Sequence, residues 1–356
     1  MFFQLEIALG EGDTTDVRKR GTKGFAFRQL GNTYLKKGVF KKALEYYQLH
    51  FSIALESGNK VEEGIGYSNL GNAFYSLGQF EKALKYHKLH LSNCKENENR
   101  AGQGSAYGNL VVTCYSLCQF DEALKYLQLQ LSIAREVGDS HGEGKACGNL
   151  GLVYDSVAQY EAALEYHKMC LSVSKQVGDK AGEGKACGNL GVAYYSIGDF
   201  KEAVKYHQLD LSVARELGDK IGEGKVCNDL GIAYYSLGEY DKATEYLRLQ
   251  LSIAKEVGDK YAEGRAYANF GLVHHSLGDF QKALECNKLY FTIAKESGNR
   301  TEEGKVYANI GIAYCCLGDF NNALACLERH LNIAREVGDK AGEGDAYTIL
   351  YLWEPR

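Results

Sequence analysis

The chain has 356 residues, of which 45% are hydrophobic and 24% are charged, a composition typical of a folded protein with a hydrophobic core. It contains 41 Gly but a single Pro, Pro355, so the glycines are expected to end helices and not to form disordered linkers. The net charge of −5 gives no reason to expect nucleic acid or an anionic membrane as a partner.

The first twenty residues do not fit the pattern of the rest of the chain. MFFQLEIALGEGD has no basic region, and Gln4 and Glu6 interrupt its apolar run, so we do not expect this stretch to act as a signal peptide. LEIALGEGD resembles the end of a helix, and a short stretch from about Thr14 to Lys19 separates it from the first regular helical pattern. We therefore expect residues 1–20 to hold a partial helix and an irregular junction.

Two features of the sequence indicate the compartment. No segment approaches the 18 or more apolar residues of a membrane span. The 11 Cys are odd in number and scattered through apparent helices, which is typical of reduced intracellular thiols. The sequence therefore predicts a cytoplasmic protein without a membrane span.

From about residue 24 to residue 348 the sequence repeats every 40 residues without insertion or deletion. A Leu-Gly pair marks the repeat at 30/31, 70/71, 150/151, 190/191 and 230/231. Leu110-Val111, Phe270-Gly271 and Ile310-Gly311 hold the same positions in the other copies. This register predicts a tandem array over residues 21–340 with eight helix pairs, and a ninth helix or truncated cap over residues 341–356.

Each repeat contains two helical patterns. The first helix of the copy from residue 180 has an apolar face with helical spacing: Cys187, Leu190, Gly191, Tyr194 and Ile197. The second helix has its own stripe: Phe200, Ala203, Val204, His207, Leu211 and Ala214. A helix pair cannot bury both stripes alone, whereas stacking against neighbouring pairs does, so the pattern predicts an α-solenoid.

Two Gly-Asp breaks per repeat predict where these helices end and begin. Gly198 is expected to end the first helix in a left-handed conformation, and Asp199 with Glu202 to form a capping box at the next one. Gly218 and Asp219 repeat the break. Gly191 is expected to let the two helices of a pair approach closely.

The stretch Tyr67-x-x-Leu70-Gly71-x-x-Phe74, followed by Ala83, resembles the tetratricopeptide repeat (TPR) pattern. The resemblance implies an all-α fold, a right-handed α-solenoid of about eight tandem TPR hairpins. The 40-residue form with LGDF, EYH and GDKAGEG segments is similar to the array of the Pins/LGN family of G-protein-signalling modulators. That resemblance implies binding of extended partner segments in spindle-orientation or cell-polarity signalling. No segment resembles the GoLoco motif, so Gα binding is not supported.

An amide side chain precedes the Leu-Gly pair in most copies. The column consists of Asn69, Asn109, Asn149, Asn189, Asp229, Asn269 and Asn309. The resemblance places these positions on the concave surface of the array. Asn is a mediocre helix residue, and its amide could hold the backbone of an extended peptide. The alternative is that recent duplication alone keeps the Asn in place.

A cationic column lies four residues before the amides, on the same helix face. It consists of Lys145, Lys185, Lys225, Arg265 and Lys305. Packed helices lie about 9 Å apart and an extended chain rises about 3.3 Å per residue, so one Asn would meet the ligand about every third residue. A row of cations would favour an acidic ligand, although a solvated Lys near a helix end is common.

Three residues after the amide, the column becomes apolar from the third copy onward. The residues are Asn32 and Asn72, and then Val112, Leu152, Val192, Ile232, Leu272 and Ile312. This predicts a ligand with periodic apolar side chains. Tyr75, Tyr115, Tyr195 and Tyr235 are expected on the same face, and we place Tyr195 and Tyr235 among the peptide-binding residues.

No motif indicates catalysis, a metal or a cofactor. His87, His167 and His207 share one position on an apolar stripe without a second ligand at fixed spacing, so they are interpreted as core residues. Cys147, Cys187 and Cys227 are interpreted as small core hydrophobes. The repeated GEG follows no strand and lacks the GK[ST] of a phosphate-binding loop.

The sequence thus predicts a non-enzymatic scaffold that binds an extended, acidic and partly apolar protein segment in the concave groove. The alternative is a structural spacer or self-associating array of a larger protein. Tyr347, Leu350, Tyr351 and Trp353 give the last helix an apolar face that a polar cap would otherwise cover, so self-association would use residues 341–356.

Overall fold

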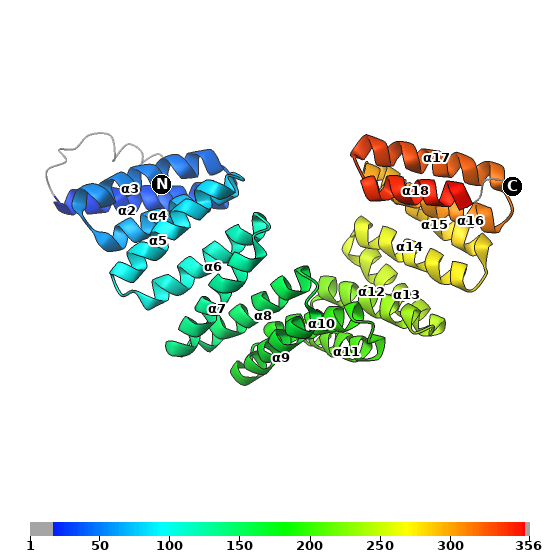
Figure 1. The fold of residues 1–356 in the computed structure, drawn as a ribbon, viewed down its shortest axis with the longest axis horizontal. Coiled ribbons are helices and arrows are strands. Elements are labelled where there is room, and N and C mark those ends of the chain that lie inside the picture. Colours follow the sequence, from blue (N-terminus) through cyan, green and yellow to red (C-terminus); the bar gives the residue numbers. More distant parts are fainter. Residues whose placement is uncertain (1–16, 353–356) are drawn as a thin grey trace. The chain divides into compact units, whose positions relative to one another are not determined.

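Residues 17–352 are described by a computed structural model (Figure 1). The chain divides into two compact units, Met1–Val177 and Gly178–Arg356. Within residues 17–352 there are seventeen helices and no strands. The all-α class and the tandem helix pairs expected from the sequence are confirmed.

The helices of the first unit are α2 (Val17–Lys36), α3 (Phe40–Ser57), α4 (Lys60–Ser76), α5 (Phe80–Glu96), α6 (Arg100–Ser116), α7 (Phe120–Glu136), α8 (Ser140–Ser156) and α9 (Tyr160–Val177). Those of the second are α10 (Lys180–Ser196), α11 (Phe200–Leu217), α12 (Lys220–Ser236), α13 (Tyr240–Val257), α14 (Lys260–Ser276), α15 (Phe280–Glu296), α16 (Arg300–Cys316), α17 (Phe320–Val337) and α18 (Lys340–Leu352). The even-numbered helices are called A helices and the odd-numbered ones B helices.

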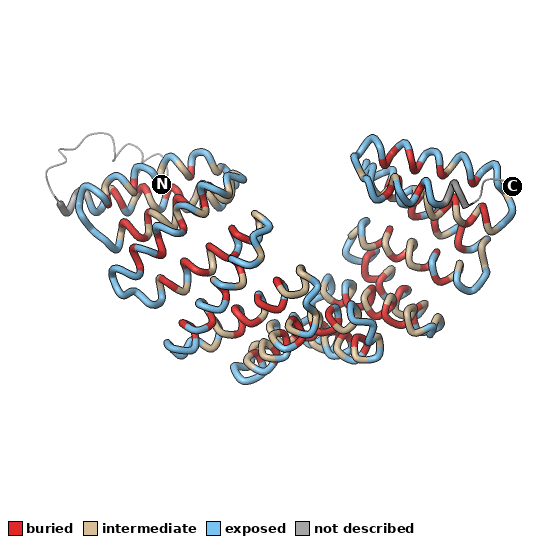
Figure 2. The backbone as a smooth tube through the Cα atoms, in the orientation of Figure 1, coloured by how far each residue is buried: buried red, intermediate tan, exposed pale blue. Residues whose placement is uncertain are grey.

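Within each unit the helices pack in chain order. An A helix packs on its own B helix, as α12 does on α13, and the B helix packs on the next A helix, α14. Consecutive A helices such as α12 and α14 also touch. Buried residues therefore form a stripe along each helix while the other sides are exposed (Figure 2).

The predicted helix boundaries follow from local chemistry. Gly198 and Gly218 have φ of +86° and +67°, the left-handed conformation that glycine adopts at low cost. Asp219 caps α12 by accepting a hydrogen bond from the Gly222 N–H at 2.9 Å. Asp199 likewise accepts from the Glu202 N–H, but the Glu202 carboxylate pairs with Lys205. The capping box expected there therefore forms only in one direction.

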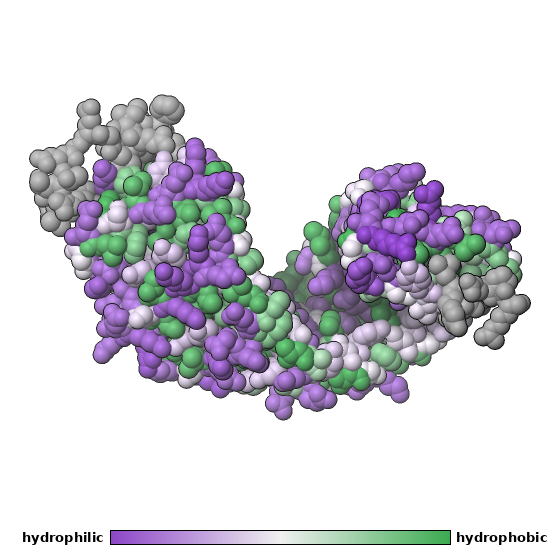
Figure 3. Space-filling model, turned by 45° about the horizontal axis from the view of Figure 1, so that its top comes forward, coloured by the Kyte–Doolittle hydropathy of each residue, from purple (hydrophilic) through white to green (hydrophobic). Residues whose placement is uncertain are grey.

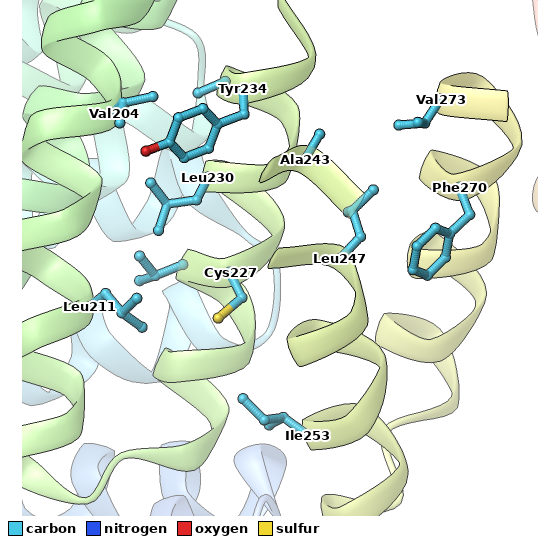
Figure 4. Packing of buried hydrophobic residues seen from close by; sticks show 12 residues of the cluster. Val204, Leu211, Cys227, Leu230, Tyr234, Ala243, Leu247, Ile253, Phe270 and Val273 are labelled. Carbon is cyan, nitrogen blue, oxygen red and sulfur yellow. The ribbon is translucent and has the colours of Figure 1, made fainter. Parts of the chain in front are cut away.

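Most residues of the predicted core stripes are buried, but Tyr194 and Phe200 are half-buried and Ile197 is exposed. Leu190 and Cys187 are buried on α10, and Ala203, His207 and Leu211 on α11. Ile197 is exposed because α10 ends at Ser196 and the next residue leaves the helical spacing. Figure 4 shows the resulting packing in the second unit, where side chains from α11, α12, α13 and α14 meet in one cluster.

The glycine of the Leu-Gly pair fits closely against the B helix. A Cβ added at Gly191 would collide with the imidazole ring of His207, sixteen residues later. Where the pair is Leu110-Val111, the partner sixteen residues after the valine is the aliphatic Leu127, and both pack in one cluster. The expected close approach of the two helices at Gly191 is therefore confirmed. The side chain on the B helix that faces this position, His207 here, limits the size of the residue that fits.

Some turns of the first unit carry a side chain where the repeat has glycine. Ala158 has φ of +57°, and the equivalent Gly198 has φ of +86°. A left-handed conformation costs a residue with a Cβ about 1 kcal/mol. We expect Ala158→Gly to raise the free energy of unfolding by about 1 kcal/mol, and Gly198→Ala to lower it by a similar amount, measured by urea denaturation. If the two variants had the same free energy of unfolding as each other, this expectation would be wrong.

The ends of the described chain bear on two sequence expectations. Helix α2 begins at Val17, inside the stretch expected to be irregular, while residues 1–16 lie outside the described residues. Helix α18 follows the eighth pair, and Tyr347 on it is exposed. The side chains of Leu350 and Tyr351, and all of Trp353, lie outside the described part, so self-association through them stays a prediction.

Candidate binding face

The Asn column lies on an accessible side of the A helices. Asn189 is half-buried, whereas its neighbours Leu190 and Gly191 are buried in the core. Asn149 is exposed, and the remaining members of the column are half-buried. The residue that reaches the surface, Asn189, is therefore the direct sequence neighbour of the residues that pack in the core. We call this side of the A helices, with positions equivalent to 185, 189 and 192, the asparagine face.

Most of these amides are not used by the fold. Within residues 17–352, no hydrogen bond is made by the side chains of Asn69, Asn109, Asn149, Asn189 and Asn309. The Nδ2 atom of Asn69 is buried and has no partner there. Amides with free donors and acceptors on an accessible surface can bind a peptide backbone.

Two members of the column are engaged within the protein. Asn269 on α14 donates from Nδ2 to Oδ1 of Asn228 on α12, at 2.9 Å. Asn228 in turn donates to Oδ1 of Asp229, also at 2.9 Å. This hydrogen-bond chain joins two consecutive A helices. Asn269 and Asp229 are thus less available to a ligand than Asn189.

The cationic column lies beside the amides, one turn earlier on each helix. Lys145, Lys185 and Lys225 are exposed, and none of them forms an ion pair within the described residues. Lys305 pairs with Glu302 at 3.0 Å, and the Arg265 guanidinium lies 5.9 Å from the ring centre of Tyr261. Three of the five cations are therefore free to meet an acidic ligand.

The apolar column is also at the surface. Val112, Leu152, Val192 and Leu272 are exposed, whereas Ile232 and Ile312 are half-buried. Figure 3 shows hydrophobic residues among hydrophilic ones on the surface in that view. Exposed aliphatic side chains at the same position of successive A helices agree with the predicted apolar component of the face.

The tyrosines of this face link neighbouring A helices. The Tyr195 hydroxyl is hydrogen-bonded to Ser236 Oγ at 3.0 Å, and Tyr235 to Ser276 Oγ at 2.8 Å. Their rings pack on aromatic residues at the start of the following B helix. Tyr75 and Tyr115 make the same hydrogen bonds in the first unit. These side chains are part of the array's framework, which the sequence interpretation missed.

Three pockets of the second unit lie between successive A helices. The largest of these three, about 310 Å³, lies over α11 between α10 and α12 and includes Lys185, Asn189, Lys225 and Asp229 in its lining. A pocket of about 220 Å³ lies over α13 between α12 and α14. The third, about 120 Å³, includes Asn309 and Ile312. We call the first two the α10–α12 pocket and the α12–α14 pocket.

Asp210 was not anticipated from the sequence, because the apolar stripes assign the B helices to the core. It lies on α11, lines the α10–α12 pocket and is half-buried. The equivalent positions of the other repeats hold His50, His90, Gln130, Cys170, Gln250, Tyr290 and His330. The sequence did contain a signal for Asp210: it is the only acid at its repeat position, and Asp229, the only acid of the Asn column, lines the same pocket.

Burial raises the pKa of Asp210 to about 6, with nearby Asp229 adding to the rise and Lys225 opposing it. Because the folded pKa lies above the unfolded value of 3.8, the carboxylate destabilises the fold above pH 6, and this cost fades between pH 6 and 4. We expect Asp210→Gln to stabilise the protein by about 1 kcal/mol at pH 7.5, after allowing for solvent screening. The difference should vanish at pH 4, as urea unfolding would show; a pH-independent difference would contradict it.

The other sequence interpretations concern core residues. His87, His167 and His207 are buried, as expected, and burial lowers the pKa of His87 to about 4. Cys147 and Cys227 are buried too, and burial raises the pKa of each to about 11, so both stay thiols at neutral pH. No group of three metal-ligating side chains occurs in the described part of the chain.

The repeated GEG has a structural role. Glu223 is buried, and its carboxylate forms ion pairs with Arg215 on α11 at 2.7 Å and with Lys220 at 3.0 Å. The pair with Arg215 holds the end of a B helix against the start of the next A helix. None of the helices within residues 17–352 is long and apolar enough to cross a membrane.

Comparison with known proteins identifies the class. One tetratricopeptide repeat model matches residues 25–96, 102–176, 184–256 and 226–296, and a second matches residues 306–341. The chain therefore belongs to the tetratricopeptide repeat family. No curated protein sequence matches it significantly.

Several solved structures share the fold at low sequence identity. The apo quorum sensor NprR from B. thuringiensis has a TM-score of 0.65 at 14% identity, covering 87% of each chain. Aspartyl phosphate phosphatase F from Bacillus subtilis has a TM-score of 0.62 at 13% identity, covering 91% of this chain and 95% of its own. A Rap protein complexed with competence and sporulation factor has a TM-score of 0.52 at 16% identity, covering 91% and 98%. These likenesses show the fold alone.

Proposed function

We propose that the protein is a non-enzymatic scaffold that binds an extended segment of a partner protein on its asparagine face. The observation that carries this proposal is the row of accessible Asn side chains that the fold leaves without hydrogen bonds, next to the buried Leu-Gly pair. Each amide offers a donor and an acceptor, which is what a peptide backbone requires whatever its side chains.

The neighbouring columns define the chemistry of the ligand. In the second unit, the unpaired Lys185 and Lys225 favour acidic residues in the bound segment and speed its encounter. The exposed Val192 and Leu272 favour apolar side chains between them. The segment is therefore acidic overall and partly apolar.

Two further considerations support binding of a peptide. A Rap protein of similar fold has been solved in complex with competence and sporulation factor. The resemblance of the 40-residue repeat to Pins-type arrays adds the proposal of a partner in spindle-orientation or cell-polarity signalling.

The proposal is tested with a displayed library of random dodecapeptides, selected on the whole chain. We expect enriched peptides to contain acidic and apolar residues and to bind more weakly as salt rises. Affinity should fall about tenfold when Lys185 and Lys225 are changed to Gln, and should not change for Lys201→Gln, an exposed lysine on α11. Equal loss with the control would exclude this face.

A further inference from the structure

Resting on the proposed peptide binding, we propose that the second unit recognises its ligand pocket by pocket. The α10–α12 pocket selects a Lys or Arg side chain of the bound segment by means of Asp210 and Asp229. The α12–α14 pocket accepts a neutral hydrogen-bond donor at Gln250. The bound segment would therefore carry one basic residue at a defined position, and the protein would prefer it to a segment that contains only acidic charges.

The two pockets are the same site in consecutive repeats. Each is bounded by two A helices with the B helix between them as its floor. Lining residues of the first recur forty positions later in the second: Gly184 and Gly224, Lys185 and Lys225, Val213 and Ile253, and Leu217 and Val257. The pockets therefore share their walls and differ in a few side chains at the floor and rim.

The floor of the α12–α14 pocket presents an acceptor without a partner. Gln250 is only 2% exposed, and its Nε2 donates to the Ala262 carbonyl oxygen at 3.3 Å. Because a carbonyl can only accept, this contact fixes the amide orientation and leaves Oε1 facing no donor within the described residues. A buried acceptor that the fold leaves unpaired calls for a donor from outside.

Asp210 holds the equivalent place in the α10–α12 pocket. Its carboxylate lies against α10, where a Cβ added at Gly188 would be 2.7 Å from Oδ2. Within residues 17–352 it makes no hydrogen bond or ion pair. In the next repeat the corresponding residues are Asn228 and Gln250. A carboxylate in place of an amide changes the preferred donor from neutral to cationic.

The charges around this pocket favour a cation at its centre. Asp210, Asp229 and Asp219 line it together with Lys185 and Lys225. Asp219 is engaged as the cap of α12, and Asp229 accepts from Asn228. The exposed lysine ammonium groups form no ion pair with these carboxylates among the described residues. A ligand Lys or Arg would satisfy the Asp210 carboxylate, while its acidic neighbours meet the lysines.

The geometry also predicts the spacing of the selected residues. Adjacent packed helices lie roughly 9 Å apart, and an extended chain advances about 3.3 Å per residue. Side chains that enter the two pockets should therefore lie about three residues apart in the ligand. The bound segment would contain a basic residue, with a neutral donor such as Ser, Thr, Asn or Gln at that distance.

The test repeats the random dodecapeptide selection with the native chain and with Asp210→Gln/Asp229→Asn, which installs the residues of the next repeat. We expect one position enriched in Lys or Arg for the native chain and no such enrichment for the variant. In a selected peptide, Lys→Gln should lower affinity about tenfold for the native chain and less than twofold for the variant. Persistence of the basic preference in the variant would overturn the inference.

A reciprocal variant tests the role of the second pocket. Gln250→Asp puts the acid of the first pocket at the equivalent place in the second and should add a second basic position about three residues from the first. Failure to add one, in a variant whose circular dichroism is unchanged, would overturn pocket-by-pocket recognition.

The outcome also separates this inference from the proposed function. Groove-bound peptides without a basic position, whose affinity still depends on Asn189, would overturn the selectivity but keep the scaffold. Peptides that bind independently of Asn189 and Asn309, or no enriched peptide at all, would overturn both.

Discussion

Replacing Asn189 and Asn309 by Ala together should lower the affinity for a selected peptide about thirtyfold and leave the fold unchanged. Each amide can pair with a backbone donor and acceptor of the ligand, so the two changes remove roughly 2 kcal/mol of binding free energy. Both side chains are without hydrogen bonds in the described structure, so their loss should cost no stability. Titration calorimetry and urea unfolding measure the two effects.

The choice of residues follows from the structure. Asn269 is avoided because its amide joins α14 to α12 through Asn228, so its loss would weaken packing as well as binding. Ser212→Ala/Ser252→Ala is the matched control, since it removes two exposed polar groups from the B helices of the same unit. Unchanged affinity in the Asn variant would leave duplication as the only reason for the column.

Gly191→Val should destabilise the second unit by about 3 kcal/mol. A Cβ at this position collides with the His207 ring, which is held between two helices and cannot move away without disturbing the core. The first unit shows that a valine can occupy this repeat position when the facing residue is a leucine, because Val111 packs with Leu127. We therefore expect Gly191→Val/His207→Leu to recover most of the loss in urea unfolding.

Comparing the single and double variants measures how much of the lost stability comes from the clash between a side chain at position 191 and the His207 ring. His207→Leu alone removes a buried ring whose Nδ1 has no partner within the described residues, so it should cost little. If the double variant were as unstable as Gly191→Val, the contact between Gly191 and His207 would not be what limits this position.

The fold was predictable because the same local signals recur in every copy. Leu190 and Gly191 keep helical spacing with Cys187, and Asp219 caps the next helix as its position after a glycine indicates. Ile197 was misplaced because periodicity does not show that a helix has ended. The pairing of Glu202 with Lys205 depends on which partner lies nearer in space.

The candidate site was only partly predictable. Adjacent A helices repeat the same residue types, so the Asn, Lys and apolar columns could be read from the period alone. Tyr195 was assigned to the ligand because its serine partner, Ser236, is forty-one residues away and belongs to another helix. Asp210 was missed because a residue on a B helix reaches the asparagine face only once the helices are packed.

Site-specific photocrosslinking tests the central claim most directly. Val192 on α10 and Leu209 on α11 are 49% and 44% exposed, so a benzophenone amino acid at either position is similarly accessible. Val192 lines the α10–α12 pocket, whereas Leu209 is not part of its lining. With a selected dodecapeptide, we predict a crosslink from position 192 and none from position 209. A crosslink from position 209 alone would contradict binding on the asparagine face.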